Sequence, residues 1–156
     1  MRLSSLNLPE WRDLPDFGLY MDQLMTCVER VFADSLPGPL TAGMVNSYVK
    51  QGLIGRPSGK KYSRASLAQL LMICVLKQTS SLDTLRQLLH PAGEDTEQLY
   101  GEFRSLLAEL TAADVSGVSP LSAALRAASW QALCRELVRE RSAQPDPKPD
   151  STGEPS

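Results

Sequence analysis

The chain has 156 residues, of which 42% are hydrophobic and 22% charged, and its formal net charge is −2. This length suits one compact domain, with or without helical extensions, and is short for two full domains. No apolar run approaches the roughly 18 residues that a membrane span requires, so we expect a protein that does not cross a membrane.

The first twelve residues lack the apolar centre and the cleavage site of a signal peptide, so we do not expect export. Cys27, Cys74 and Cys134 are odd in number, far apart, and embedded in apolar helical patterns. That usage supports neither a disulfide framework nor a zinc site. The composition therefore favours a cytoplasmic protein with no metal and no cofactor.

Charge is segregated along the chain. Residues 1–34 carry a net charge of −3, residues 35–90 carry seven cations against Asp83 alone and reach +6, and residues 91–156 carry −5. Phosphate neutralisation depends on local rather than total charge, so the middle region suits nucleic acid despite the negative total. A basic face that is merely solvated is the commoner origin of such clusters.

The first half of the chain alternates helical patterns with turn signals. Asp16 is a candidate cap for a helix over 17–33, and the prolines and glycine of 35–39 predict a loop. A helix follows over 41–51, capped by Thr41 and ended by Gly52 in a left-handed conformation.

Residues 55–62 are too rich in Gly and Pro for a helix and predict an exposed hairpin or loop. Ser63 is a cap for a helix over 64–78, whose apolar stripe is broad enough for nearly complete burial. This segment is therefore the predicted central helix of the core. Ser80 or Ser81 starts a further helix that runs to Leu89.

The acidic second half predicts two more helices. One covers 95–110, and the longest begins at Ser119-Pro120, ends near Arg141, and is expected to direct five apolar residues inward: Leu121, Leu125, Ala128, Leu133 and Leu137. Residues 142–156 have almost no apolar side chains and are expected to be disordered. The predicted organisation is a domain over 1–93, a helical region over 94–141 and a tail over 142–156.

Between residues 40 and 90 a series of motifs occurs in a set order. It consists of the segment from Tyr48 to Ile54, then Tyr62-Ser63, then Leu67, Leu70 and Ile73, then Ser81-Leu82-Asp83. This order resembles a MerR-type winged helix, and it is similar to a family of uncharacterised bacterial proteins related to MerR-type regulators. The resemblance implies an all-α fold: a MerR-like winged helix-turn-helix core with additional C-terminal helices and a disordered tail.

The resemblance implies a DNA-binding transcriptional regulator whose recognition helix, 41–51, enters the major groove of double-stranded DNA. Short polar side chains on such a helix reach base edges, which selects Asn46, Ser47, Lys50 and Gln51. Flexible cations on or beside the loop over 55–62 reach phosphates, which selects Arg56, Lys60, Lys61 and Arg64. For Tyr48 and Tyr62, a hydroxyl contact with phosphate and packing of the ring in the core are equally plausible.

Two positions depart from the regulators. Asn46 stands where they usually have arginine, and Ser47 where they have an aromatic residue. The predicted loop is also shorter than usual. A base preference therefore does not carry over.

Enzymatic chemistry has little support in the sequence. His90 is the sole histidine and lies beside Pro91 at a predicted helix end, and there is no glycine-rich phosphate loop. We therefore expect a protein that is not an enzyme. The first hypothesis is a regulator that binds DNA through residues 40–90, while its C-terminal helices form a homodimer or receive a signal. The second is a non-catalytic protein-protein interaction adaptor that retains the winged-helix fold.

Overall fold

The computed structural model describes residues 6–36, 38–90, 95–111 and 116–144. This part of the chain is helical, and its β structure is limited to two isolated antiparallel bridges. Its helices are η2 (Trp11–Asp13), α1 (Met21–Phe32), η3 (Ala33–Ser35), α2 (Ala42–Lys50), α3 (Arg64–Leu76), α4 (Leu82–Leu89), α5 (Thr96–Thr111) and α6 (Pro120–Ala143). The all-α expectation is confirmed, whereas the MerR-like winged helix stays a hypothesis.

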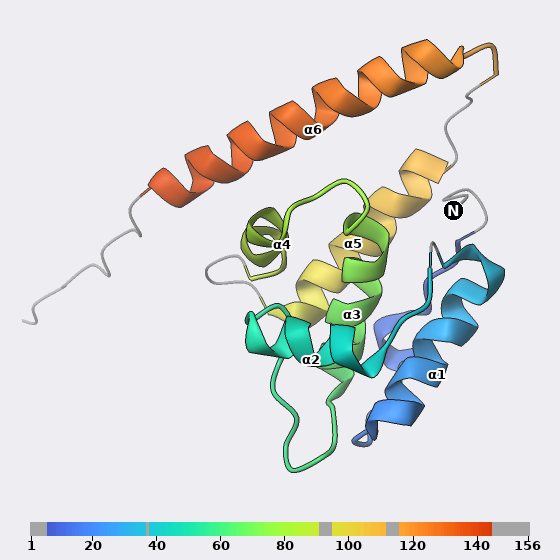
Figure 1. Cartoon of the computed structure of the whole chain (residues 1–156), viewed down its shortest axis with the longest axis vertical. Coiled ribbons are helices and arrows are strands. Elements are labelled where there is room, and N and C mark those ends of the chain that lie inside the picture. The colour runs from blue at the N-terminus through green and yellow to red at the C-terminus, as the bar shows by residue number, and fades with distance from the viewer. Residues whose placement is uncertain (1–5, 37, 91–94, 112–115, 145–156) are drawn as a thin grey trace, which may run out of the picture.

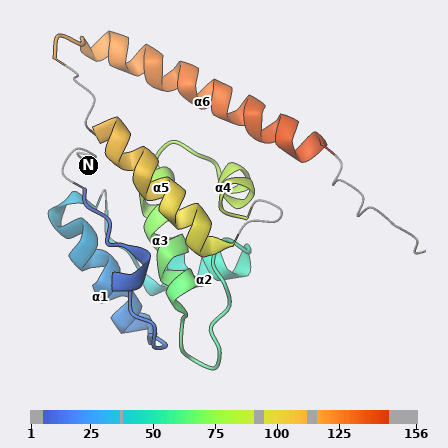
Figure 2. The same cartoon turned by 180° about the vertical axis from the view of Figure 1, so that it is seen from behind.

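The centre of the fold is α3. Nine successive residues of this helix, Ser66 to Cys74, are buried. A helix that is apolar around its whole circumference needs neighbours on every side. Helices α1, α4 and α5 pack against α3, and α2 crosses near its N-terminal end (Figure 1, Figure 2). The prediction of a central core helix is confirmed.

Side-chain caps fix where the helices start. Thr41, Ser63, Ser81 and Ser119 each accept a hydrogen bond from the backbone N–H three residues later. This satisfies one of the amides that a helix start leaves without an intrahelical partner. Three of these caps are as predicted, and of the two serines proposed for α4 it is Ser81 that caps.

The predicted start of the first helix was wrong. Helix α1 begins at Met21 rather than near residue 17, and Asp16 does not cap it. Leu19 instead pairs with Tyr62: its N–H donates to the Tyr62 carbonyl at 2.9 Å and its carbonyl accepts from the Tyr62 N–H at 2.7 Å. This pairing needs an extended backbone at Leu19, which delays the helix. The N–H of Tyr20 then donates to Gln23 Oε1 at 3.0 Å.

Helix α5 joins the core and holds the segment before η2. The fully buried Tyr100 donates its hydroxyl to the carbonyl of Pro9 at 2.9 Å, and Arg104 Nε donates to that of Leu8 at 3.0 Å. Burial raises the pKa of Tyr100 to about 12, so its hydroxyl stays protonated and keeps donating at neutral pH. Two segments far apart in the sequence are thereby joined.

Helix α6 differs from its predicted packing. The five residues expected to point inward are all exposed: Leu121, Leu125, Ala128, Leu133 and Leu137. Apolar residues occur around the whole of α6 rather than along one stripe, so a single packing partner covers only some of them. The helix packs on α4, where Ser142 Oγ donates to Gln87 Oε1 at 2.7 Å.

Two further expectations concern the residue at which α6 ends and the tail that follows it. The helix continues through Ala143, beyond the predicted end near Arg141. The tail expected to be disordered lies, from residue 145 onward, outside the described residues. Within the described part, none of the helices combines the length and apolar character needed to span a membrane.

The three cysteines should differ in reactivity. Cys74 is fully buried in α3, and burial raises its pKa to about 11, whereas Cys27 and Cys134 are partly exposed. Because the thiolate is the nucleophile, we expect iodoacetamide at pH 8 to alkylate Cys27 and Cys134 while sparing Cys74. Peptide mass spectrometry measures this, with the denatured chain as control. Equal labelling of all three thiols in the folded chain would contradict the buried position of α3.

Candidate nucleic-acid interface

Helix α2 presents one polar face. Val45 and Tyr48 point into the core, while Asn46 and Lys50 are exposed. Gly52, with φ +74°, ends the helix in the left-handed conformation expected from the sequence, and the N–H of Leu53 donates to the Tyr48 carbonyl at 2.9 Å. The exposed face of α2 therefore follows from which of its residues pack into the core.

Helix α4 holds the C-terminal end of α2. Arg86 Nε donates to the carbonyl of Gln51 at 3.0 Å, and His90 Nε2 lies within hydrogen-bond distance, 3.1 Å, of the carbonyl of Leu53. Arg86 also pairs with Asp83 at 3.0 Å. The single histidine therefore has a structural partner, and α2 is fixed in orientation by polar contacts as well as by packing.

Two of the four side chains expected to read bases are bonded to each other. Gln51 Nε2 donates to Ser47 Oγ at 2.8 Å, and both residues are half-buried. Either side chain would have to give up or share this bond to reach a base edge. Asn46 and Lys50 are the two that face solvent.

Residues 55–62 form the exposed turn predicted from the sequence, which we call the basic hairpin. Ser58 and Lys61 pair in antiparallel fashion, with N–H to carbonyl distances of 2.9 and 3.1 Å, and Gly59 has φ +63° at the turn. A positive φ favours glycine because it has no Cβ. Arg56, Lys60 and Lys61 are exposed on this hairpin.

The start of the basic hairpin is anchored by two buried polar residues of α3. The N–H of Gly55 donates to Gln69 Oε1 at 2.9 Å, and Ser66 Oγ donates to the carbonyl of Gly55 at 3.2 Å. Gln69 Nε2 also lies 3.4 Å from Thr96 Oγ1 on α5. Sequence reasoning missed both residues, although a glutamine and a serine among the apolar residues of a buried helix are the available signal.

The end of the basic hairpin is fixed by the Leu19–Tyr62 pairing and by the close approach of Gly18. A Cβ at position 18 would lie 2.7 Å from Lys61 Cβ, so only glycine fits. The Lys61 ammonium lies 5.4 Å from the ring centre of Tyr20, within the range of a cation–π contact. The hairpin is thus held at both ends while its cations stay at the surface.

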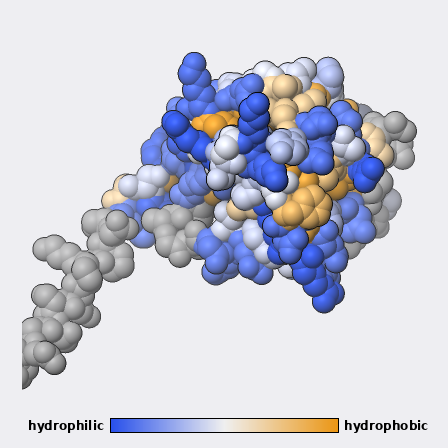
Figure 3. Space-filling view, turned by 90° about the horizontal axis from the view of Figure 1, so that it is seen from below, coloured by the Kyte–Doolittle hydropathy of each residue, from blue (hydrophilic) through white to orange (hydrophobic). Residues whose placement is uncertain are grey.

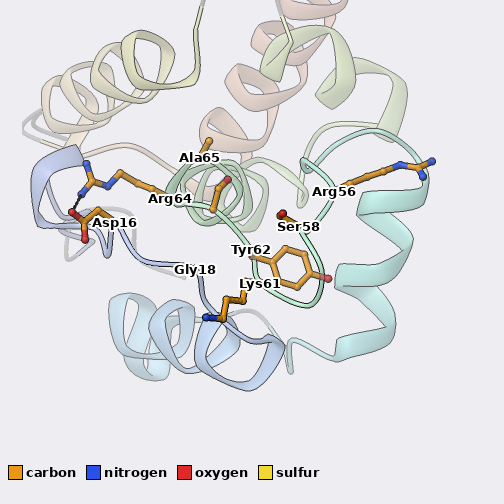
Figure 4. A pocket seen from close by; sticks show the side chains of 9 residues that line it. Asp16, Gly18, Arg56, Ser58, Lys61, Tyr62, Arg64 and Ala65 are labelled. Atoms are coloured by element: carbon orange, nitrogen blue, oxygen red, sulfur yellow. Dashed lines mark ion pairs between the residues drawn. The ribbon is translucent and has the colours of Figure 1, made fainter.

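A pocket of about 550 Å³ lies between the hairpin and the N-terminal end of α3, lined by residues that include Asp16, Arg56, Lys61 and Arg64. Arg56 and Arg64 point in opposite directions from α3, and Lys61 points in a third (Figure 4). The cations therefore do not converge on one point. They are spread along a surface, which suits a row of phosphates better than a single small anion.

Arg64 is more restrained than the other predicted cations. It lies 3.9 Å from Asp16 Oδ2 and its guanidinium is 5.7 Å from the Trp11 ring centre, while its Nε is buried with no hydrogen-bond partner among the described residues. By contrast, in the part of the chain that the structure describes no carboxylate lies within ion-pair distance of four cations: Lys50, Arg56, Lys60 and Lys61.

Tyr48 and Tyr62 are both buried. Burial raises the pKa of Tyr48, and its ring packs among core residues. These positions favour the core-packing alternative for the two tyrosines.

Seen from the side of the basic hairpin, the surface is predominantly hydrophilic, with smaller hydrophobic areas between (Figure 3).

Removing the Gln69 amide should loosen the basic hairpin. In Gln69→Leu the N–H of the exposed Gly55 loses its protein acceptor, and the net loss of one hydrogen bond costs about 0.5–1.5 kcal/mol. We expect a lower free energy of unfolding in urea and faster hydrogen exchange of the hairpin amides. Gln98→Leu, at an exposed position of α5, is the matched control. Unchanged hairpin exchange in Gln69→Leu would show that the anchor is dispensable.

The chain was compared with known families and proteins. Residues 9–105 match the model of a family described as a domain of unknown function (DUF1836). That span includes α1 to α4, the basic hairpin and most of α5, and it gives no evidence of a relationship to MerR-type regulators. Comparisons with curated proteins and with solved structures found no match. Because the match covers more than half of its length, the chain belongs to the DUF1836 family.

Proposed function

We propose that the chain binds duplex DNA and acts as a transcriptional regulator, with α2 in the major groove and the basic hairpin on phosphates. The observation that carries this proposal is the set of four exposed cations without carboxylate partners in the described chain, Lys50, Arg56, Lys60 and Lys61. Lys50 lies on the exposed polar face of α2, and the other three lie on the basic hairpin. A cation that already forms an ion pair with a protein carboxylate would contribute little to the binding of a phosphate.

The dimensions of α2 suit a groove. An α-helix with its side chains is about 10–12 Å across, which matches the width of the major groove, about 12 Å. The nine residues of α2 give it a length of about 13–14 Å. Asn46 and Lys50 are four residues apart and lie on one face, one turn from each other. Asparagine pairs well with adenine edges and lysine with guanine edges, so these two residues are the proposed readers.

The hairpin supplies the sequence-independent part of the contact. Its cations are spread, as the phosphates of a duplex are, and its backbone is held at Gly55 and Tyr62 before DNA arrives. A loop that is ordered in advance loses less conformational entropy on binding. Asp16 lies on the far side of α3 from α2, as Figure 4 shows, so this carboxylate does not face the proposed DNA-binding side.

The winged-helix part of the proposal rests on α2, the basic hairpin, α3 and α4. Helices α1 and α2 are separated by residues 33–41, longer than the three- or four-residue turn of a helix-turn-helix. We therefore propose that recognition uses α2 and the hairpin, without a tight turn before them. We further propose a homodimer, because two-fold related half-sites require two copies.

The direct test is the fluorescence anisotropy of a labelled random-sequence duplex, titrated with the protein at about 50 and 200 mM salt. We expect binding in the micromolar range that weakens steeply with salt, because phosphate contacts release counterions. No binding at the lower salt would overturn the proposal and favour the protein-protein interaction adaptor.

Two variants separate phosphate contacts from base contacts. Lys60→Ala with Lys61→Ala removes two cations, so the slope of log K against log salt should flatten by about 2, at a similar cost for every sequence. Arg12→Ala with Arg30→Ala removes the same charge away from the site and should leave the slope near that of the unaltered chain. Asn46→Ala should mainly reduce discrimination between selected and random duplexes. A slope unchanged by the lysine pair would contradict the role of the hairpin.

A further inference from the structure

An open, predominantly apolar groove lies away from the basic hairpin. It has a volume of about 590 Å³ and is lined by α3, α4 and α5, with Cys134 and Arg141 of α6 at its edge. Its α5 side is open: Leu106 is 50% and Leu110 70% exposed. Large apolar side chains gathered at an open groove mark an interaction surface more often than a chance feature.

Helix α6 carries a second uncovered apolar face. Trp130, Leu133 and Leu137 are spaced by three and four residues, so they lie on one side of the helix. Trp130 is 70% exposed and Leu137 55%. The helix already rests on α4 through a different side, where Gln131, Cys134 and Val138 are half-buried. Among the described residues of one copy, the tryptophan face is therefore left exposed.

The tryptophan face of α6 and the α5 side of the groove, where Phe103 is half-buried, share one pattern. Phe103, Leu106 and Leu110 have the same spacing as Trp130, Leu133 and Leu137, and in both segments a glutamate precedes the last leucine. Each set extends about 10 Å along its helix. Two apolar ridges of equal length and spacing can pack side by side in a defined register.

The charges of the two helices are complementary. Helix α5 carries three glutamates against Arg104, a net charge of −2. Helix α6 carries four arginines against two glutamates, a net charge of +2. An α6 lying along an α5 is thus favoured electrostatically, whereas α5 along α5 or α6 along α6 brings like net charges together.

We propose that the tryptophan face of α6 in one copy of the chain docks on the Phe103, Leu106 and Leu110 face of α5 in a second copy, and reciprocally. One two-fold axis generates both contacts, so the assembly closes as a dimer. If all the exposed parts of these side chains were buried, they would contribute on the order of 600 Å² per copy, at the lower limit of the roughly 600–1,000 Å² per partner of a standard interface. Trp130, the largest of them, is the expected hot spot.

The proposal is tested by the mass of the full chain in solution, measured by light scattering after size-exclusion chromatography across a concentration series. We expect a dimer for the unaltered chain. Trp130→Ser with Leu137→Ser should give a monomer, and so should Leu106→Ser with Leu110→Ser. Phe17→Ser, which removes an equally exposed aromatic ring elsewhere, should remain a dimer. Unaltered far-UV circular dichroism checks that the helices persist.

Mixing the two monomeric variants gives the sharper result. The intact α6 of one variant can dock on the intact α5 of the other, so a heterodimer with one of the two contacts should form. An α5 variant that stays dimeric would show that α6 pairs with α6 and would overturn this arrangement. A monomeric unaltered chain at every concentration would overturn it as well. None of these measurements involves DNA, so their failure is distinct from a failure of the proposed DNA binding.

Discussion

Burial of α3 on all sides is the constraint on which the rest of the structure depends. Because Ser66 to Cys74 are all buried, the chain must surround this helix, and α1, α4 and α5 do so. The two polar residues in that run need partners, since a buried group without one is costly. They find them in Gly55. The helix that builds the core therefore also positions the basic hairpin.

This arrangement separates two kinds of surface. The basic hairpin and α2 lie at one end of the molecule, whereas α6 and the C-terminal end of α5 lie toward the other (Figure 1). Cations with no carboxylate partner among the described residues lie at the first end, and exposed apolar side chains of α5 and α6 lie at the second. A partner on the α5 and α6 surface would leave the hairpin free. The proposed DNA binding and the proposed self-association would therefore not compete for residues.

The features that sequence reasoning predicted are those set by local chemistry. Residues close in sequence determine the caps at Thr41, Ser63 and Ser119, the left-handed conformation of Gly52 and the burial of α3. The errors have non-local causes. The start of α1 depends on the pairing of Leu19 with Tyr62, and the exposure of α6 depends on which neighbours reach it. The exposed turn with Arg56, Lys60 and Lys61 was predictable, but its anchor at Gln69 was not, because that contact spans fourteen residues.

The family match covers the surface formed by α2 and the basic hairpin, but it leaves out most of the surface formed by α5 and α6. Residues 9–105 include every predicted site residue and Gln69, so the core and the basic hairpin are what the DUF1836 family model describes. The match ends before Leu106 and excludes the whole of α6. The uncovered apolar faces thus lie mainly in the part of the chain beyond the match. Helices other than α6 surround α3, and α6, although it packs on α4, buries none of its own residues fully. A long helix with uncovered apolar side chains is best explained by contacts outside the single copy.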